Sequence, residues 1–446
     1  MSFKYKIAPL CLFLTLGLNA QQELMQHSLT DLWHSTSLNP ALFPEGKRLA
    51  LGLPAFSLDA AHSGDLTYND LLRKKGDRTV IDLSQAISRL DPENEAYFDQ
   101  RTETVSLGLR SPGGKWAFQI GHAIQLNGQI NYPKSLAEVL WNGNAPYIGE
   151  TLQIGPQVDI FDWQELYFGV SRKIGRFSLG ARVKYLMGVS ALRSDADHKV
   201  MSIYTDPDIY QLTITTDYAF YSSSIISAID TAGLGFDFVT GSFGKSPSVD
   251  NPGVAFDLGF EARLSDNLSV NAAVLNLGGR ITWKKDAQYY ISQNAYTYEG
   301  VDFPGTDLIN GTDSLDFEGK LDTLNDIFQF AKQAQQFETT LPVRVVAGAT
   351  FKLSERWHLG LNASYTDLEG RSSTAVGASL RWLPLRWLSL GAMYGANSRS
   401  AANFGFHLAV KPGPVQVYLL SDNLLNAFSL KSSPAVNLKL GAALVF

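Results

Sequence analysis

Charged residues of both signs occur at alternate positions in several strand-like segments of this 446-residue chain. Residues two apart in a β-strand point to the same face, so these charges would share one face of a sheet. Mixed charges in a narrow enclosed space usually pair with one another and with whatever fills that space. Ion pairing, rather than a substrate path, is therefore the chemistry that we expect from them. The residues expected on this face are Arg182, Lys184, Asp257, Glu261, Arg263, Arg344 and Arg381.

Residues for covalent catalysis are sparse. A serine-hydrolase site would need a histidine beside a serine and an acid or amide, whereas His122, His358 and His407 are isolated in the sequence. The histidines show no metal-ligand spacing. Gly244-Lys245-Ser246 resembles the end of a phosphate-binding loop, but Val239 stands where that loop needs a glycine. We expect no enzymatic activity and no cofactor.

An acidic stretch between residues 302 and 326 contains seven carboxylates and a single base, Lys320. Several carboxylates together favour Ca²⁺, so a surface calcium site is one interpretation. Their spacing fits no calcium-binding loop, and we expect a solvated loop without a metal.

Residues 1–20 have the layout of a cleaved secretory signal. Lys4 and Lys6 precede an apolar run that is too short to cross a bilayer as a helix and that contains Cys11, the only cysteine. The formal net charge of −6 disfavours a nucleic-acid partner.

The segments that carry these charges have the sequence pattern of β-strands. Six short turn sequences, each between alternating segments, would join seven hairpins, which predicts an all-β transmembrane antiparallel β-barrel of fourteen strands. Both termini would then be periplasmic, in a bacterial outer membrane. If a hairpin of 198–206 with 209–221 entered the wall, the count would be sixteen. The expected strands are 48–58, 102–110, 115–130, 161–172, 176–190, 253–264, 268–285, 341–353, 356–366, 372–382, 386–395, 402–411, 414–421 and 436–446.

A soluble β-sandwich shows the same two-residue alternation of apolar and polar side chains as a membrane barrel. The two folds differ in the residue types on the outward face of each strand. In 253–264, Val254, Phe256 and Leu258 would face outward and Asp257 inward. Outward aromatic residues are expected near both ends of the strands, as two interfacial belts require. Those near the short turns are Trp116, Trp357, Trp382 and Phe446, and those at the opposite ends are Tyr185, Tyr365 and Tyr394.

Residues 21–47 lack alternation and contain the compact turn Asn39-Pro40-Ala41, in which Asn39 can bond its own backbone. We expect this segment to be a plug or hatch, followed by the barrel over 48–446. Glycines recur on the inward face of twelve of the fourteen expected strands. They favour barrel curvature, with room for a plug or an elongated ligand as the alternative.

The long connections would lie on the cell surface. Val80, Leu83, Ile87 and Leu90 recur at helical spacing, and Leu324, Ile327, Phe328 and Ala331 do so later in the chain. We expect a helix in each of these two connections.

The turn Asn39-Pro40-Ala41 ahead of fourteen strands resembles the long-chain fatty-acid transporter superfamily of outer-membrane barrels, whose N-terminal segment folds into the lumen as a hatch. Four further motifs are similar to an uncharacterised Bacteroidota outer-membrane family. They are Phe256-Asp257-Leu258-Gly259, Leu275-Asn276-Leu277-Gly278 with Ile281-Thr282-Trp283, Leu341-Pro342, and Ser421-Asp422-Asn423-Leu424-Leu425. The resemblance implies no activity, because kinship with the transporters and with the shuttle barrels of type IX secretion is by fold only.

Two functions remain open from the sequence. The favoured one is hatch-gated passive uptake of a small hydrophobic molecule by a monomeric barrel surrounded by outer-membrane lipid. The alternative is a sealed barrel whose loops dock a surface or secreted protein.

Overall fold

The computed structural model describes residues 24–63, 70, 72–75, 78–81, 83–224, 249–298, 330–369, 371–397, 403–423 and 435–446. The expected signal segment 1–20 and the acidic stretch 302–326 lie outside these residues.

Fourteen antiparallel strands form a closed barrel wall, and β1 closes it by pairing with both β4 and β21. This confirms the expected fold and strand count. In order around the wall, the strands are β1 (Leu49–His62), β4 (Glu93–Arg110), β5 (Trp116–Pro133), β7 (Gln157–Ile174), β8 (Phe177–Thr205), β10 (Pro252–Arg263), β11 (Leu268–Trp283), β15 (Val343–Lys352), β16 (Trp357–Leu368), β17 (Arg371–Leu385), β18 (Leu388–Asn397), β19 (Asn403–Val410), β20 (Val415–Ser421) and β21 (Ala435–Val445).

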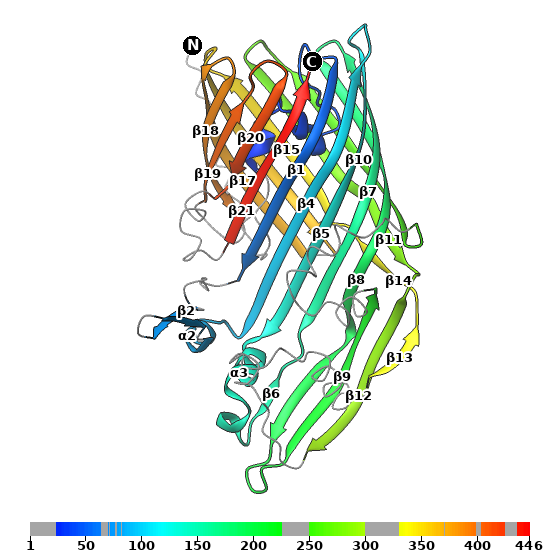
Figure 1. The fold of residues 1–446 in the computed structure, drawn as a ribbon, viewed down its shortest axis with the longest axis vertical. Helices are drawn as coiled ribbons and strands as arrows, with labels where there is room; N and C mark the ends of the chain where they lie inside the picture. The colour runs from blue at the N-terminus through cyan, green and yellow to red at the C-terminus, as the bar shows by residue number, and fades with distance from the viewer. Residues whose placement is uncertain are drawn as a thin grey trace, which may run out of the picture.

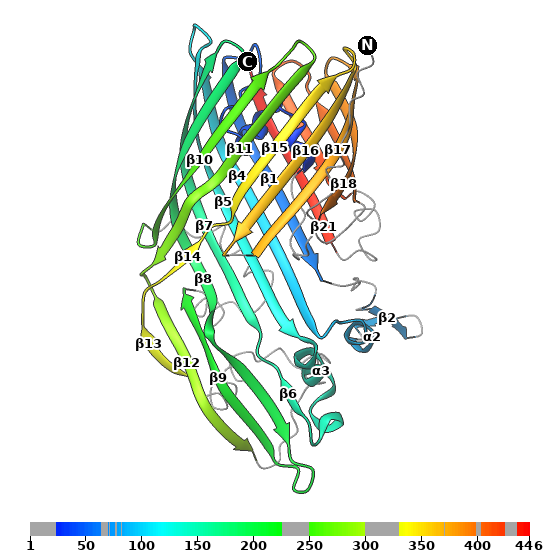
Figure 2. The same cartoon turned by 180° about the vertical axis from the view of Figure 1, so that it is seen from behind.

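The hairpin expected at 198–206 and 209–221 forms between the end of β8 and β9 (Leu212–Ser223), from Lys199↔Tyr218 to Thr205↔Leu212. It does not enter the wall. β9 pairs instead with β12 (Ala287–Tyr298), while the first part of β8 pairs with β10. The sixteen-strand alternative is therefore wrong, and the extra strands extend one side of the barrel as a protruding sheet (Figures 1 and 2).

Short strands complete this extension. β13 (Ala331–Ala334) pairs with β12, β14 (Phe337–Thr340) pairs with β11, and β6 (Thr151–Gln153) pairs with β8. The two ends of the molecule thus differ: the short turns and Phe446 lie at one end, and the protruding sheet lies at the other (Figure 1). We call these the short-turn end and the long-loop end.

Helices at the long-loop end are α2 (Leu83–Ser88), α3 (Lys134–Asn142) and the 3₁₀ turn η3 (Ala145–Tyr147), near the small hairpin of β2 (Leu72–Lys75) and β3 (Arg78–Ile81). The first expected helix is present as α2, but Val80 belongs to β3 because the helix starts later. Ala331, expected in the second helix, lies in strand β13, and the rest of that helix lies outside the described residues.

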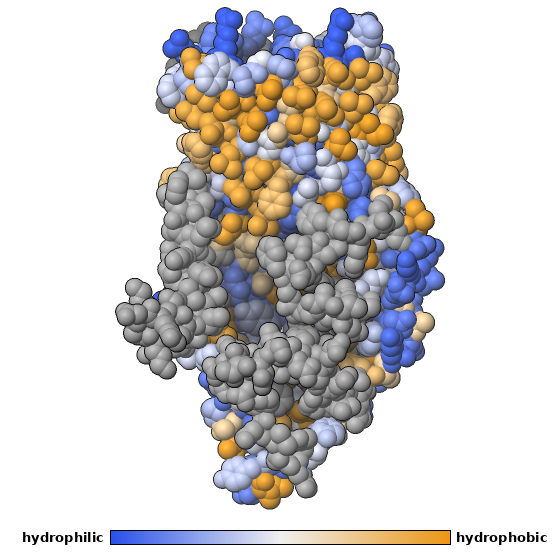
Figure 3. Space-filling view, viewed as in Figure 1, coloured by the Kyte–Doolittle hydropathy of each residue, from blue (hydrophilic) through white to orange (hydrophobic). Residues whose placement is uncertain are grey.

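The outer surface of the wall is apolar. Val254, Phe256 and Leu258 on β10 are 42–49% exposed, whereas Asp257 between them is fully buried. Trp116, Trp357 and Tyr394 are exposed outward aromatic residues. On the face drawn in Figure 3, an apolar band crosses the molecule below the short-turn end. A single closed sheet with this exterior excludes a β-sandwich. Among the helices of the described residues, none is long and apolar enough to cross a bilayer.

Candidate functional site

Residues 24–44, which we call the plug segment, lie inside the barrel and contain α1 (Leu24–His27) and the 3₁₀ helix η1 (Trp33–Ser37) (Figures 1 and 2). Met25, Leu29 and Trp33 are completely buried. Met25 and Leu29, with Leu24 and Leu32, pack against inward apolar side chains of the wall such as Met393, and Trp33 packs in a separate cluster that includes Phe43 and Val445. A segment without periodicity can fold here because the wall surrounds it on all sides.

Polar side chains of the wall bind the backbone of the plug segment. The Asp422 carboxylate accepts hydrogen bonds from the backbone nitrogens of Leu24 and Met25 at 2.8 and 2.9 Å. The Trp33 backbone nitrogen donates to Gln416 Oε1 at 3.0 Å. The buried backbone donors of these helical turns are thereby satisfied from the wall, which short helices cannot do by themselves.

The turn Asn39-Pro40-Ala41 closes on itself and on the wall. Asn39 Oδ1 accepts a bond from the Ala41 nitrogen at 2.9 Å. Asn39 Nδ2 donates to the carbonyl oxygens of Phe260 on β10 and Ala272 on β11, at 3.0 and 3.2 Å. The turn is therefore hydrogen-bonded to the backbones of β10 and β11.

Inward glycines make room for the plug segment. A Cβ atom at Gly259 would lie 2.1 Å from Asn39 Oδ1, and one at Gly180 would lie 2.4 Å from the Pro40 backbone. From the sequence we expect these glycines to serve barrel curvature. The close contacts instead favour the alternative, in which they make room for the plug segment. The glycines whose added Cβ would meet the plug segment closer than 3.0 Å are Gly52, Gly108, Gly180, Gly259 and Gly360.

Three of the seven charged residues form one buried cluster. Asp257 is bound by Lys184 Nζ at 3.0 Å and by Arg182 at 3.4 Å, and all three are at most 4% exposed. Arg182 also donates to the Thr36 carbonyl of the plug segment at 2.7 Å. Pairing supplies the compensation that buried charges require.

Residues from three of the sequence motifs meet at this cluster. The Asn276 nitrogen donates to Asp257 Oδ1 at 2.9 Å, and its side chain donates to the Pro342 carbonyl at 3.0 Å. Asn276 has φ of 59°, a left-handed conformation that asparagine tolerates better than most residues. The motifs therefore hold a bulge of β11 against the charge cluster.

The remaining charges lie apart from this cluster. Arg344 pairs with Asp99 at 3.0 Å, and Arg263 pairs with Glu45 at 2.7 Å. Arg381 holds Asp31 of the plug segment with both terminal nitrogens, at 2.9 and 2.7 Å. Glu261 forms no ion pair within 4.0 Å with another residue of the described part of the chain.

Asp31, Asp422, Gln416 and Lys411 make plug–wall contacts, and the sequence pattern did not identify any of them as a contact residue. Asp422 lies in the motif Ser421–Leu425, which was a usable signal. Asp31 lies in a segment without periodicity, and its partner Arg381 is 350 residues away in the sequence. No local pattern could have paired them.

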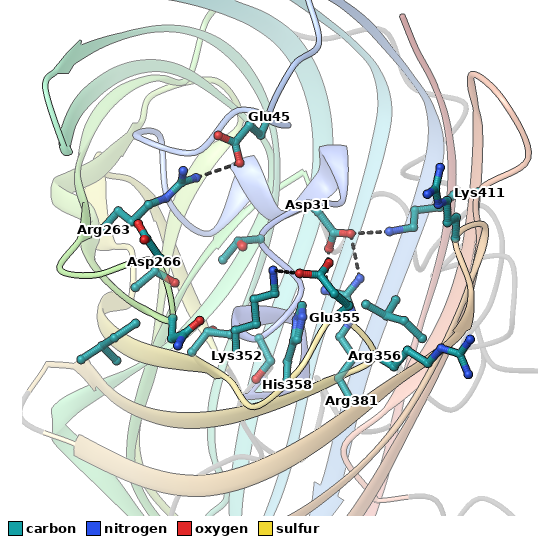
Figure 4. A pocket seen from close by; sticks show the side chains of 18 of the residues that line it. Asp31, Glu45, Arg263, Asp266, Lys352, Glu355, Arg356, His358, Arg381 and Lys411 are labelled. Atoms are coloured by element: carbon teal, nitrogen blue, oxygen red, sulfur yellow. Dashed lines mark hydrogen bonds and ion pairs between the residues drawn. The ribbon is translucent and has the colours of Figure 1, made fainter.

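A cavity of ≈ 830 Å³, which we call the vestibule, opens at the short-turn end (Figure 4). Asp31 and Glu45 face it from the N-terminal segment, and Arg263, Arg381 and Lys411 face it from the wall. Burial alone would raise the pKa of Asp31, but Arg381 and Lys411 outweigh burial and hold that pKa far below its usual range.

A second, smaller cavity of ≈ 30 Å³ lies toward the long-loop end, where Ser37 and Leu38 of the plug segment line it together with Trp163, Lys184 and Arg344. This volume holds about two water molecules or one small polar group. The plug segment thus lies between two cavities and lines both.

Within the described strands of the wall, one serine hydroxyl lies beside a histidine ring nitrogen. Ser389 Oγ lies 2.9 Å from His407 Nε2, and Arg381 Nε donates to the same oxygen at 2.8 Å. Among the residues that the structure describes, none forms a hydrogen bond with His407 Nδ1, so none of them completes a triad. Across the described ranges, no three metal-binding side chains come together.

The wall and the plug segment together define the class of protein. It is a closed fourteen-strand antiparallel barrel with an apolar exterior and an N-terminal segment folded into its lumen. The chain belongs to the family described as "Family of unknown function (DUF5723)", whose model matches residues 40–422. Membership in an uncharacterised family, expected from the motifs, is confirmed. The family has no stated activity.

Solved outer-membrane channels have similar chains at low identity. The toluene transporter TodX of Pseudomonas putida is 11% identical, with 96% of this chain and 98% of that chain covered and a TM-score of 0.46. The toluene transporter TbuX of Ralstonia pickettii is 10% identical, with 93% of each chain covered and a TM-score of 0.43. No curated protein matches this sequence.

Proposed function

We propose that this protein is a monomeric outer-membrane channel in which the plug segment gates the passive passage of a small molecule with a hydrophobic body. The short-turn end, with both chain termini, faces the periplasm, and the protruding sheet faces the cell exterior. Lipid surrounds the apolar band.

The observation that carries this proposal is the position of the plug segment between two cavities. Ser28, Thr30 and Asp31 line the vestibule, whereas Ser37 and Leu38 line the smaller cavity on the opposite side. Movement of this one segment would join the two spaces. Glu45, which follows the plug segment in the chain, pairs with Arg263 at the vestibule, and both side chains are exposed. Ion pairs in contact with water contribute about 0–1 kcal/mol, so this one does little to hold the segment.

A disulfide that can be formed and reduced tests whether movement of the plug segment controls passage through the barrel. The hydroxyl oxygens of Ser28 in the plug segment and Ser379 on β17 are 2.7 Å apart. Ser28→Cys with Ser379→Cys, in a chain carrying Cys11→Ser, places two thiols where a disulfide can fix the plug segment to the wall. The measurement is uptake of the fluorescent probe N-phenyl-1-naphthylamine into liposomes that contain the protein.

Uptake should be lost on oxidation and restored on reduction, while Ser28→Cys alone should respond to neither. Equal uptake through the oxidised and reduced double variant would contradict gating. Deleting residues 21–47 adds a second measurement, which should increase the leak of arabinose in a liposome-swelling assay.

A second function, docking of a surface or secreted protein, is favoured by the protruding sheet of β8, β9 and β12. It has its own apolar cluster, which includes Met201, Ile203, Ile214 and Tyr218. Weighing the complex extracted from native membranes separates the two functions: a stoichiometric protein partner supports docking, and a lone barrel supports transport. No nucleic acid is expected in either case.

A further inference from the structure

Asp31 occupies a point where two cations of the wall converge (Figure 4). Arg381 binds both carboxylate oxygens, and Lys411 pairs with the same carboxylate. The side chains of Arg381 and Lys411 are only 9% and 16% exposed, whereas that of Asp31 is 38% exposed. The carboxylate is therefore the member of this group that a solute in the vestibule can reach and replace.

The charged side chains that line the vestibule are predominantly cationic. Six cationic side chains face four carboxylates. The cations are Arg263, Lys352, Arg356, Arg381, Arg386 and Lys411, and the carboxylates are Asp31, Glu45, Asp266 and Glu355. This excess attracts anions into the cavity.

We propose that Arg381 and Lys411 form a carboxylate-binding site, which Asp31 occupies while the plug segment is docked and which a small amphipathic carboxylate occupies when that segment moves. This inference rests on the proposed gating function and names its substrate class. Two largely buried cations without an anion are unfavourable, so the plug segment leaves most readily when another anion takes its place.

The chemistry of the site selects the ligand. The guanidinium of Arg381 presents two parallel N–H donors, the arrangement that matches a planar carboxylate. Leu268, Leu383 and Pro384 also line the vestibule and offer apolar surface to the body of such a molecule. Because the ligand and Asp31 compete for one site, binding of the ligand must favour the undocked plug segment.

Hexanoate is a suitable probe, with 1-hexanol as the neutral compound of equal chain length. Isothermal titration of the full chain in detergent should show that Asp31→Asn, which removes the internal competitor, binds hexanoate about tenfold tighter than the unmodified chain. Glu338→Gln makes the same chemical change in an exposed pair with Arg280, so the affinity should not change. Hexanol should bind all three chains equally and weakly.

A second measurement follows the plug segment directly. Ser35 is 1% exposed, so Ser35→Cys, with Cys11→Ser, should react slowly with a thiol reagent. Hexanoate should accelerate this labelling and hexanol should not. Lys411→Gln keeps the Asp31–Arg381 pair but removes one cation of the site, so hexanoate should accelerate labelling less in this variant.

Equal hexanoate affinity in the unmodified chain and Asp31→Asn would overturn the proposal, as would equal effects of hexanoate and hexanol on labelling. These measurements do not depend on transport. If hexanoate binds as expected but the disulfide lock leaves probe uptake unchanged, the binding site is retained and the gating function is wrong.

Discussion

At the scale of single residues, Gly259 decides how closely the plug segment approaches the wall. Its missing Cβ would lie 2.1 Å from Asn39 Oδ1 and 2.8 Å from the Ala41 nitrogen. Gly259→Ala should therefore destabilise docking by about 1–3 kcal/mol, the usual cost of overpacking. The expected result is a faster arabinose leak in liposomes.

Gly169→Ala is the matched control, because a Cβ there would have its nearest neighbours at an ordinary 3.6 Å. Its leak should equal that of the unmodified chain. If both variants leaked equally, the close approach at Gly259 would not be what holds the turn Asn39-Pro40-Ala41.

At the scale of elements, η1 carries a group that makes docking depend on pH. His34 is 3% exposed, and burial lowers its pKa below the usual 6.5, although Glu103, 3.8 Å away, acts in the opposite direction. Lys439 and Arg101 lower it further. The undocked plug segment would therefore bind a proton at a higher pH than the docked one.

Neutral His34 favours the docked plug segment. This contribution to docking is fully present above pH 6.5 and is lost as the pH falls from 6.5 toward the lowered pKa of His34. Arabinose leak should therefore rise on acidification through this range. His34→Gln should flatten the response, whereas His198→Gln, at an exposed pair with Asp217, should not alter it. An identical pH profile in all three chains would exclude His34 as the cause.

At the scale of the whole molecule, the closed wall makes the apolar exterior compatible only with a membrane. Leu258 is 49% exposed on the outer face of β10, so Leu258→Lys should destabilise the barrel in lipid by up to about 2–4 kcal/mol. Urea titration of folding into vesicles measures this.

Ile209→Lys is the control, since Ile209 is 67% exposed in the β8–β9 turn, in the long-loop half of the molecule. Its folding free energy should change by less than about 0.5 kcal/mol. Equal effects at both positions would mean that the outer face of β10 at Leu258 does not contact lipid.

The sequence by itself determined the strands and their faces. Alternation is local, and a one-residue slip would turn Asp257 outward and Phe256 inward, so each strand carries its own register. Turn sequences between strands then fixed the order around the wall. For this reason all fourteen expected strands are present, although their ends extend at the long-loop end, as β8 does to Thr205.

Only the tertiary structure decided what fills the lumen and where the extra hairpin pairs. β8 continues beyond the wall and pairs there with β9, and β9 then pairs along its other edge with β12. Asp31 meets Arg381, and Leu24 meets Asp422, across 350 and 398 residues. Contacts of that separation exist only after the barrel closes, because closure alone brings the first residues of the chain and the last strands into one enclosed space.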